Sequence, residues 1–159
     1  MFGKGEKIKM RRFEVVREDA RKTEGNIILP TRAATGSAGS DFYSAIDFEI
    51  KPGETKLIPT DVKAKMLTNE VLLLFVRSSI GIKKHIVLAN GTGVIDSTYY
   101  SNPDNDGNIC GAFTNIGTET QEFKAGDRIM QGVFLEYLTT VDDKPVNAER
   151  TGGIGSSGV

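Results

Sequence analysis

Many short apolar runs separated by turn-forming residues restrict the fold of this chain more than any other feature. Clusters of Gly, Asn, Asp and Pro bound these runs, as is typical of strands joined by tight turns. No segment repeats apolar residues with a helical period over three turns, so we expect only a short helix over Ile80–Lys84 and a helical turn over Glu18–Lys22. The pattern predicts an all-β sandwich or barrel rather than a βαβ fold. The expected strands are Arg12–Val16, Asn26–Leu29, Asp41–Ile50, Lys56–Ile58, Val62–Met66, Val71–Val76, Ile86–Leu88, Ile109–Phe113, Gln121–Phe123 and Ile129–Tyr137.

The length of 159 residues suits one domain with one core. Residues 1–10 (MFGKGEKIKM) have no amphipathic period and are expected to form a loose leader. Residues 11–148 would form the single β-barrel domain. Residues 149–159 (ERTGGIGSSGV) are so rich in Gly and Ser that we expect a flexible C-terminal tail.

Composition narrows the classes of partner and compartment. The 20 Lys and Arg residues nearly balance the 21 Asp and Glu residues, which disfavours nucleic acid and anionic membranes as partners. The longest apolar run, Val71–Val76, is far too short to cross a bilayer. A single cysteine, Cys110, and a single histidine, His85, exclude an internal disulfide and a structural zinc site. A cytoplasmic location fits these features best.

Arg77, Ser78 and Ser79 follow the apolar strand at the expected start of the short helix. A guanidinium, two hydroxyls and free backbone N–H groups at such a position match the oxygens of a phosphate. A simple helix cap beside a surface ion pair is the alternative.

The segment Asn90–Tyr99 (NGTGVIDSTY) leads a carboxylate, Asp96, from a strand into a turn. Flanked by apolar residues, this carboxylate could act as a base toward water, while the Asn90 amide could pair with the edge of a planar base. The Tyr99 ring could wall a sugar pocket. The alternative is a hairpin turn that uses Asn and Asp only to cap the backbone.

Two later segments have weaker signals. Asp127 and Arg128 would point to opposite faces of a strand and are expected to make separate structural contacts, whereas Gln131 could reach a site. In the tail, Arg150 and the following Gly and Ser residues could cradle a polyphosphate, although no Lys follows the glycines as a Walker loop requires.

The order of these segments carries more information than each alone. Five segments resemble, in sequence order, the five motifs of the trimeric dUTP pyrophosphatases: AGSDFYSA (38–45), RSSIG (77–81), NGTGVIDSTY (90–99), GDRIMQ (126–131) and RTGGIGSSG (150–158). The resemblance runs from about Pro30 to the end of the chain. It implies a distorted β-barrel or jelly roll and a homotrimer whose sites draw motifs from different subunits.

The resemblance also implies an activity, hydrolysis of dUTP to dUMP and pyrophosphate, and a role for each matching residue. Asp96 would be the general base, Asn90 would read uracil within a hairpin with Cys110 opposite, and Tyr99 would exclude a 2′-hydroxyl. Mg²⁺ would be held by phosphate oxygens and water, with Asp41 at most in the outer shell. The implied substrate-binding residues are Arg77, Ser78, Ser79, Asn90, Gly93, Val94, Ile95, Tyr99, Cys110, Gln131, Arg150, Gly153, Ile154, Gly155, Ser156 and Ser157.

The chain departs from the family pattern in two places. Ile154 stands where the family has a Phe that stacks on uracil, and Tyr100–Asp106 (YSNPDND) lengthens the connection after Tyr99. A dCTP deaminase of the same fold is one alternative, but Ala112 stands where those enzymes carry a catalytic Glu. A non-catalytic nucleotide-sensing or protein-binding trimer is another, and a purely structural jelly roll would leave the order of the motifs unexplained.

Overall fold

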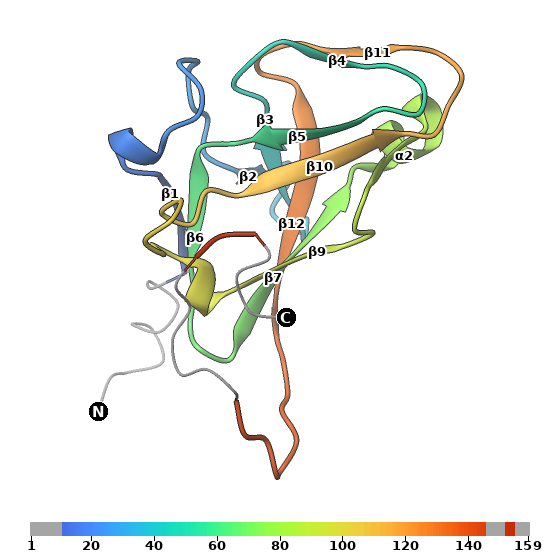
Figure 1. Cartoon of the computed structure of the whole chain (residues 1–159). Helices are drawn as coiled ribbons and strands as arrows, with labels where there is room; N and C mark the ends of the chain where they lie inside the picture. The colour runs from blue at the N-terminus through green and yellow to red at the C-terminus, as the bar shows by residue number, and fades with distance from the viewer. Residues whose placement is uncertain (1–10, 146–151, 155–159) are drawn as a thin grey trace.

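The computed structural model describes residues 11–145 and 152–154, and the expected leader and most of the expected tail lie outside these ranges. Most of the regular secondary structure of the described chain is β-strand (Figure 1). Its strands are β1 (Arg12–Val15), β2 (Thr31–Arg32), β3 (Ser40–Tyr43), β4 (Phe48–Ile50), β5 (Thr55–Pro59), β6 (Val62–Lys65), β7 (Glu70–Val76), β8 (Ile86–Leu88), β9 (Gly93–Asp96), β10 (Cys110–Asn115), β11 (Gln121–Phe123) and β12 (Arg128–Glu136). Its helical elements are the 3₁₀ turns η1 (Glu18–Ala20) and η2 (Ser97–Tyr99) and the α-helix α2 (Ser78–Lys84).

Four sheets share one core. The largest has the strand order β2-β3-β12-β7-β9, and a second has the order β5-β10-β8. Figure 1 shows β10 crossing in front of β12. The two small sheets, β1-β6 and β11-β4, complete the structure. This arrangement confirms the predicted all-β, jelly-roll-like fold.

The side-chain pattern of the strands explains the core. Along β10, buried and partly exposed residues alternate strictly, which brings the side chain of Phe113 inward. In β7, which lies between β12 and β9, Leu72 and Leu74 are fully buried. These three side chains join Phe42 and Met130 in one apolar cluster between the sheets.

Several strands and turns differ from expectation. Residues 26–29 form no strand, because Ile28 and Leu29 are exposed and Pro30 removes a backbone donor before the short strand β2 begins. The strand expected over residues 41–50 is divided into β3 and β4 by a turn in which Ser44 Oγ donates to the carbonyl oxygen of Ile46. The expected short helix is present and begins two residues earlier, at Ser78.

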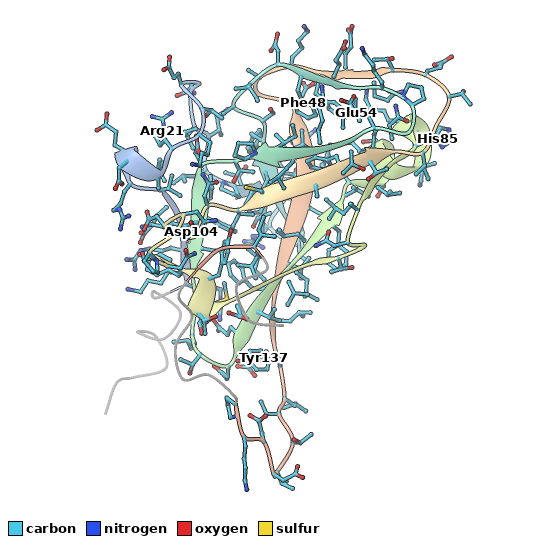
Figure 2. The ribbon with its side chains drawn as sticks, viewed as in Figure 1. Arg21, Phe48, Glu54, His85, Asp104 and Tyr137 are labelled. Atoms are coloured by element: carbon cyan, nitrogen blue, oxygen red, sulfur yellow. The ribbon has the colours of Figure 1, made fainter. Side chains whose placement is uncertain are left out.

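His85 ends helix α2 in the left-handed conformation, with φ 55°, and lies at one side of the molecule (Figure 2). In the part of the chain that is described, no helix is both long enough and apolar enough to cross a membrane.

Candidate active site

A pocket of about 440 Å³, here called the Tyr99 pocket, collects the predicted residues of the central motif. It lies where β9 of the large sheet faces β8 and β10 of the second sheet. The predicted residues that line it are Asn90, Gly93, Val94, Ile95, Tyr99, Cys110 and Ile154, and Leu57, Leu74, Leu88, Ala89 and Ala112 complete it.

The prediction that the central motif forms a hairpin with the segment around Cys110 is wrong. Strand β9 pairs with β7, from Asp96 opposite Val71 to Gly93 opposite Leu74, whereas β10 pairs with β5 and β8. A cavity therefore opens between the two sheets. At its floor, a Cβ on Gly93 would lie 2.9 Å from the Cβ of Leu74, so only glycine allows β9 to approach β7 so closely.

Tyr99 forms a fixed wall of this pocket. It ends η2 and is only 4% exposed. Its hydroxyl donates to the carbonyl oxygen of Asn108 (2.8 Å) and accepts from Asn105 Nδ2 (2.8 Å). Because the hydroxyl is held at both its donor and its acceptor side, the ring has one orientation available for contact with a ligand.

Asp96 makes the capping contacts of the second alternative that the sequence left open. It caps η2, since its Oδ1 accepts hydrogen bonds from the backbone N–H (3.0 Å) and the hydroxyl (2.6 Å) of Thr98. Fixing Oδ1 also fixes where Oδ2 points. Sequence reasoning did not single out Thr98, although a hydroxyl residue two positions after an Asp is a recognisable capping signal.

A second pocket, of about 540 Å³ and here called the Arg77 pocket, collects the other predicted polar residues. It is lined by Arg77, Ser78, Ser79 and Gln131 together with Ala33, Ser37, Ala38, Gly39, Asp41 and Val133. Its polar side chains are a guanidinium, hydroxyls, an amide and the Asp41 carboxylate. The guanidinium, the hydroxyls and the amide suit the oxygens of an anion.

Asp41 holds the guanidinium of this pocket in place. Arg77 Nε donates to Asp41 Oδ1 at 3.0 Å, and Arg128 Nη1 donates to Asp41 Oδ2 at 3.3 Å. Asp41 is 7% exposed, so its charge is buried between two cations. Arg128 thus makes the structural contact expected of it, and Asp127 makes a separate one by accepting from the backbone N–H of Lys124.

Gln131 projects from β12 into the same pocket. Its Nε2 lies 3.4 Å from the carbonyl oxygen of Val76, to which it donates. A Cβ on Gly39 would lie 2.5 Å from Gln131 Oε1, so the glycine makes room for this side chain.

Asp96 and Arg77 lie toward opposite ends of β7. Asp96 is paired with Val71 near the start of this strand, and Arg77 directly follows its last residue, Val76. At about 3.3 Å per residue, the Cα atoms of Val71 and Val76 are roughly 16 Å apart. Within one chain, Asp96 therefore does not lie beside Arg77.

Cys110 contributes a neutral thiol to the Tyr99 pocket. Burial, with a smaller effect from the Asp61 carboxylate, raises the pKa of Cys110 to about 11. Its Sγ lies 3.7 Å from the carbonyl oxygen of Asn108. At neutral pH this side chain is a small apolar lining group and not a thiolate nucleophile.

The C-terminal residues are described only in part. Gly153 donates its backbone N–H to Asp104 Oδ2 at 3.1 Å, and Ile154, which is 67% exposed, lines the Tyr99 pocket. The predicted residues Arg150, Gly155, Ser156 and Ser157 lie outside the described residues.

Within residues 11–145 and 152–154, no three His, Cys, Asp or Glu side chains are grouped closely enough to hold a metal ion. The carboxylate of the Arg77 pocket, Asp41, already accepts from two guanidinium groups. These residues therefore suit a cation that arrives with an anionic ligand and is coordinated mainly by that ligand.

The fold and the two pockets place the chain in the structural class of the solved dUTPases. The crystal structure of the dUTPase from Streptococcus mutans superimposes with a TM-score of 0.72 at 43% identity, covering 81% of this chain and 98% of that one. The dUTPase of phage phi11 of S. aureus shares the fold at 24% identity, with a TM-score of 0.67 and coverage of 87% of this chain and 97% of that one.

Sequence comparison gives the family. The dUTPase family model matches residues 25–158. The deoxyuridine 5'-triphosphate nucleotidohydrolase of Lactococcus lactis is 43% identical over 152 residues, covering 95% of this chain and 99% of the relative. The enzyme of the same name from Haemophilus influenzae strain PittEE is 40% identical over 137 residues, covering 82% and 87%. The chain belongs to the dUTPase family, which confirms the resemblance of its five motifs.

Proposed function

We propose that the protein hydrolyses dUTP to dUMP and pyrophosphate, as a homotrimer in which the Tyr99 pocket of one subunit and the Arg77 pocket of another form one site. The observation that supports this most is the separation of Asp96 from Arg77, which lie toward opposite ends of β7 within one chain. The reaction would limit incorporation of uracil into DNA and supply dUMP for synthesis of dTMP.

The Tyr99 pocket would select the nucleoside. The Asn90 amide offers both a donor and an acceptor to the uracil edge, and Val94, Ile95 and Cys110 line the same cavity. The fixed Tyr99 ring would pack on the deoxyribose and leave no room for a 2′-hydroxyl. Gly93 and Ile154 would cover the remaining faces of the base.

Asp96 would act as the general base. Its Oδ2 would accept a proton from a water whose oxygen attacks the α-phosphorus, while the bond to the bridging oxygen breaks and pyrophosphate leaves. The hydrogen bonds from Thr98 to Oδ1 orient the carboxylate for this step.

The Arg77 pocket would hold the phosphates through Arg77, Ser78, Ser79 and Gln131. The tail residues Arg150, Gly155, Ser156 and Ser157 would add contacts to the outer phosphates. Mg²⁺ bound to the phosphates would supply neutralisation of their negative charge. A phage phi11 dUTPase has a reported structural Mg(II) ion, although at 24% identity that relative supports only the fold.

Deamination of dCTP is disfavoured at this site. Ala112, which the sequence resemblance aligns with the catalytic Glu of the same-fold deaminases, lines the Tyr99 pocket from β10 and brings no carboxylic acid to it.

The first test measures pyrophosphate release from dUTP, UTP, dTTP and dCTP, with Mg²⁺ and with a chelator, while the dCTP sample is also assayed for dUTP. We expect Mg²⁺-dependent release from dUTP alone. Conversion of dCTP would identify a deaminase, and binding of dUTP without turnover of any nucleotide would identify a sensing module.

The variant Asp96→Asn tests the base. Because an amide oxygen still accepts from Thr98, the cap and the fold should persist. We expect turnover to fall by about 10²–10⁴-fold with dUTP affinity largely retained. Asp47→Asn, which alters an exposed carboxylate, should retain full turnover. Near-normal turnover of Asp96→Asn would rule out this carboxylate as the base.

Subunit mixing tests the shared site. Asp96→Asn and Arg77→Ala should each be inactive alone, and co-refolding them should restore activity in trimers that combine an intact Asp96 with an intact Arg77. If both residues served the same subunit's site, the mixture would stay inactive.

A further inference from the structure

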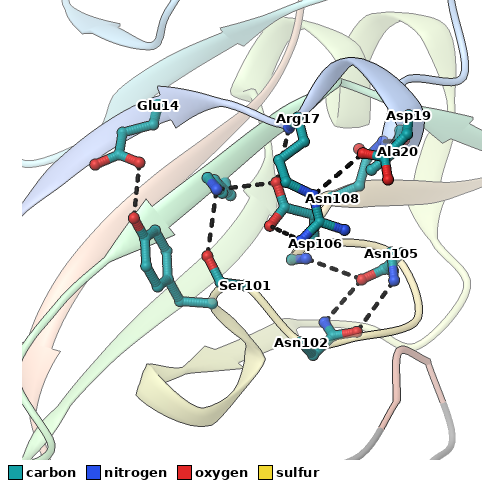
Figure 3. A network of polar contacts seen from close by, with 12 residues as sticks. Glu14, Arg17, Asp19, Ala20, Ser101, Asn102, Asn105, Asp106 and Asn108 are labelled. Atoms are coloured by element: carbon teal, nitrogen blue, oxygen red, sulfur yellow. Dashed lines mark hydrogen bonds and ion pairs between the residues drawn. The ribbon is translucent and has the colours of Figure 1, made fainter.

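The segment Tyr100–Asp106, here called the 100–106 loop, directly follows Tyr99 and folds on its own side chains (Figure 3). Asn102, 3% exposed, is its most connected residue. Asn102 Oδ1 accepts from the backbone N–H groups of Asp104 and Asn105, both at 3.1 Å. Its Nδ2 donates to Asn105 Oδ1 and to the backbone carbonyl oxygen of Tyr99, both at 2.8 Å. This buried amide therefore ties the loop to the backbone of Tyr99.

Asp106 fastens the loop to the rest of the barrel. Its Oδ2 accepts from the backbone N–H of Arg17 (2.7 Å) and from Lys63 Nζ (2.9 Å), which also donates to Ser101 Oγ (3.2 Å). Ser101 and Asp106 both have left-handed backbones, with φ of 54° and 57°. Non-glycine residues keep such a conformation only where the surroundings enforce it, so the loop is held in one shape.

The orientation of the Asn105 amide follows from its neighbours in this loop. Asn105 Oδ1 accepts from Asn102 Nδ2 at 2.8 Å and from the backbone N–H of Gly107 at 3.0 Å. Because both of these groups can only donate, the amide oxygen must face them and the amide NH₂ group must point the other way. There Asn105 Nδ2 donates to the Tyr99 hydroxyl at 2.8 Å. The loop therefore supplies a fixed donor to this hydroxyl.

Asn108, 1% exposed, supplies an equally fixed acceptor. Its backbone carbonyl oxygen accepts from the Tyr99 hydroxyl at 2.8 Å. The Asn108 side chain is paired with the fully buried Asp61: its Oδ1 accepts from the Asp61 backbone N–H at 3.0 Å, and its Nδ2 donates to Asp61 Oδ1 at 2.7 Å. The Tyr99 hydroxyl thus lies between one donor and one acceptor that are both held by buried contacts.

Tyr99 is consequently held at both of its ends by the same loop. Asn102 contacts its backbone carbonyl group, Asn105 contacts its hydroxyl, and the ring between them lines the Tyr99 pocket. A ring fixed only at its backbone can still tilt about its side-chain torsions. The contact at the hydroxyl removes this freedom, so the position of the pocket wall depends on Asn105.

We infer that Asn105 is a positioning residue that determines sugar specificity through the Tyr99 hydroxyl, because it holds the ring where a 2′-hydroxyl has no room. The consequence for the sugar rests on the proposed function, whereas the hydrogen-bonded support of Tyr99 does not. The insertion after Tyr99 thereby gains a role in the discrimination between dUTP and UTP.

A double-mutant cycle tests whether Asn105 acts through the hydroxyl. The readout is the ratio of kcat/KM for dUTP to kcat/KM for UTP. We expect Asn105→Ala to lower this ratio on the order of fivefold, the factor that one hydrogen bond contributes to an equilibrium, mainly because UTP is used better. In the Tyr99→Phe background, Asn105→Ala should cause little further change. An equal fall of the ratio in both backgrounds would overturn the inference, because it would show a general effect of the loop.

The variant Asn105→Asp isolates the donor and serves if Asn105→Ala does not fold. Its carboxylate still accepts from Asn102 and Gly107 but cannot donate, so the Tyr99 hydroxyl would lie between two acceptors with one proton. The ring must move away from one of them, and the ratio should fall. Asn69→Asp makes the same change at an exposed position before β7 and should keep the parent ratio. A parent ratio in Asn105→Asp would overturn the inference.

Urea unfolding tests the support of Tyr99 without any substrate. The parent, Asn105→Ala, Tyr99→Phe and the double variant are compared at one fixed protein concentration. We expect the double variant to lose less stability than the sum of the two single losses, because both substitutions remove the same hydrogen bond. Additive losses would overturn the link, whatever the enzyme prefers. If the losses are coupled but dUTP is not turned over, the proposed function fails instead, and affinities for non-hydrolysable dUTP and UTP analogues then supply the ratio.

Discussion

Replacing Asp106 with Asn removes one buried charge and changes little else. The Asp106 side chain is 1% exposed, and its partner Lys63 is 9% exposed, with Oδ2 and Nζ 2.9 Å apart. Asn has the same shape as Asp and tolerates the left-handed backbone at this position, φ 57°. The variant therefore tests the buried ion pair that anchors the 100–106 loop.

The expected cost follows from what remains around the Lys63 ammonium. Removing one partner of a buried pair costs about 3–5 kcal/mol. Ser101 Oγ at 3.2 Å and the Tyr100 ring at 4.9 Å still contact Nζ, so the lower end applies, about 3 kcal/mol. For a chain of this size each kcal/mol lowers Tm by about 2–4 °C, and we expect a fall of roughly 6–12 °C.

The assay is urea and thermal unfolding at one fixed protein concentration. The matched control is Asp47→Asn, since the pair Asp47–Lys124 is exposed at 62% and 69% and should contribute less than about 1 kcal/mol. Adding Lys63→Met to Asp106→Asn should recover much of the loss, because no unpaired charge is then buried. If Asp106→Asn were as stable as Asp47→Asn, the reasoning would be refuted.

The pH dependence gives a second check. Burial pushes the pKa of Asp106 upward, but the hydrogen bonds from Arg17 N–H and the Lys63 ammonium outweigh it and hold this pKa below its usual range. The pair therefore stabilises the fold above the unfolded-state pKa of about 3.9 and loses this effect as the pH falls through the lower folded-state pKa. The stability gap between the protein and Asp106→Asn should narrow on acidification, and a constant gap would contradict this assignment.

Two further predictions concern the pockets. In the variant Asp41→Asn, the single amide oxygen can accept from only one of Arg77 and Arg128. We expect kcat/KM for dUTP to fall roughly tenfold, mainly because KM rises. An unchanged KM would show that Arg77 does not need the contact with Asp41. Because its pKa is raised to about 11, Cys110 should react with iodoacetamide at pH 8 about 10²-fold more slowly than free cysteine. Mass spectrometry would measure this labelling rate, with the denatured protein as control. Labelling at the rate of free cysteine would contradict the burial of this thiol.

Local patterns were enough to predict the type of fold. The apolar run Val71–Val76, bounded by polar residues, became the central strand β7, because a strand that is covered on both faces of its sheet has apolar side chains along its length. The same reasoning failed at residues 26–29. β-branched residues have the same local preference whether or not a partner strand is available, and here the segment stays exposed.

The sequence by itself determined which residues are available for chemistry and in what order, since motif spacing is a property of the chain. It could not determine the pairing of β9 with β7. This pairing places the two segments of the expected hairpin in different sheets, and the Tyr99 pocket opens between them. Nor could it determine the buried contact of Asp41 with Arg77 or the link from Asn105 to Tyr99. Strand pairing and burial depend on contacts between distant segments, and only the tertiary structure brings those segments together.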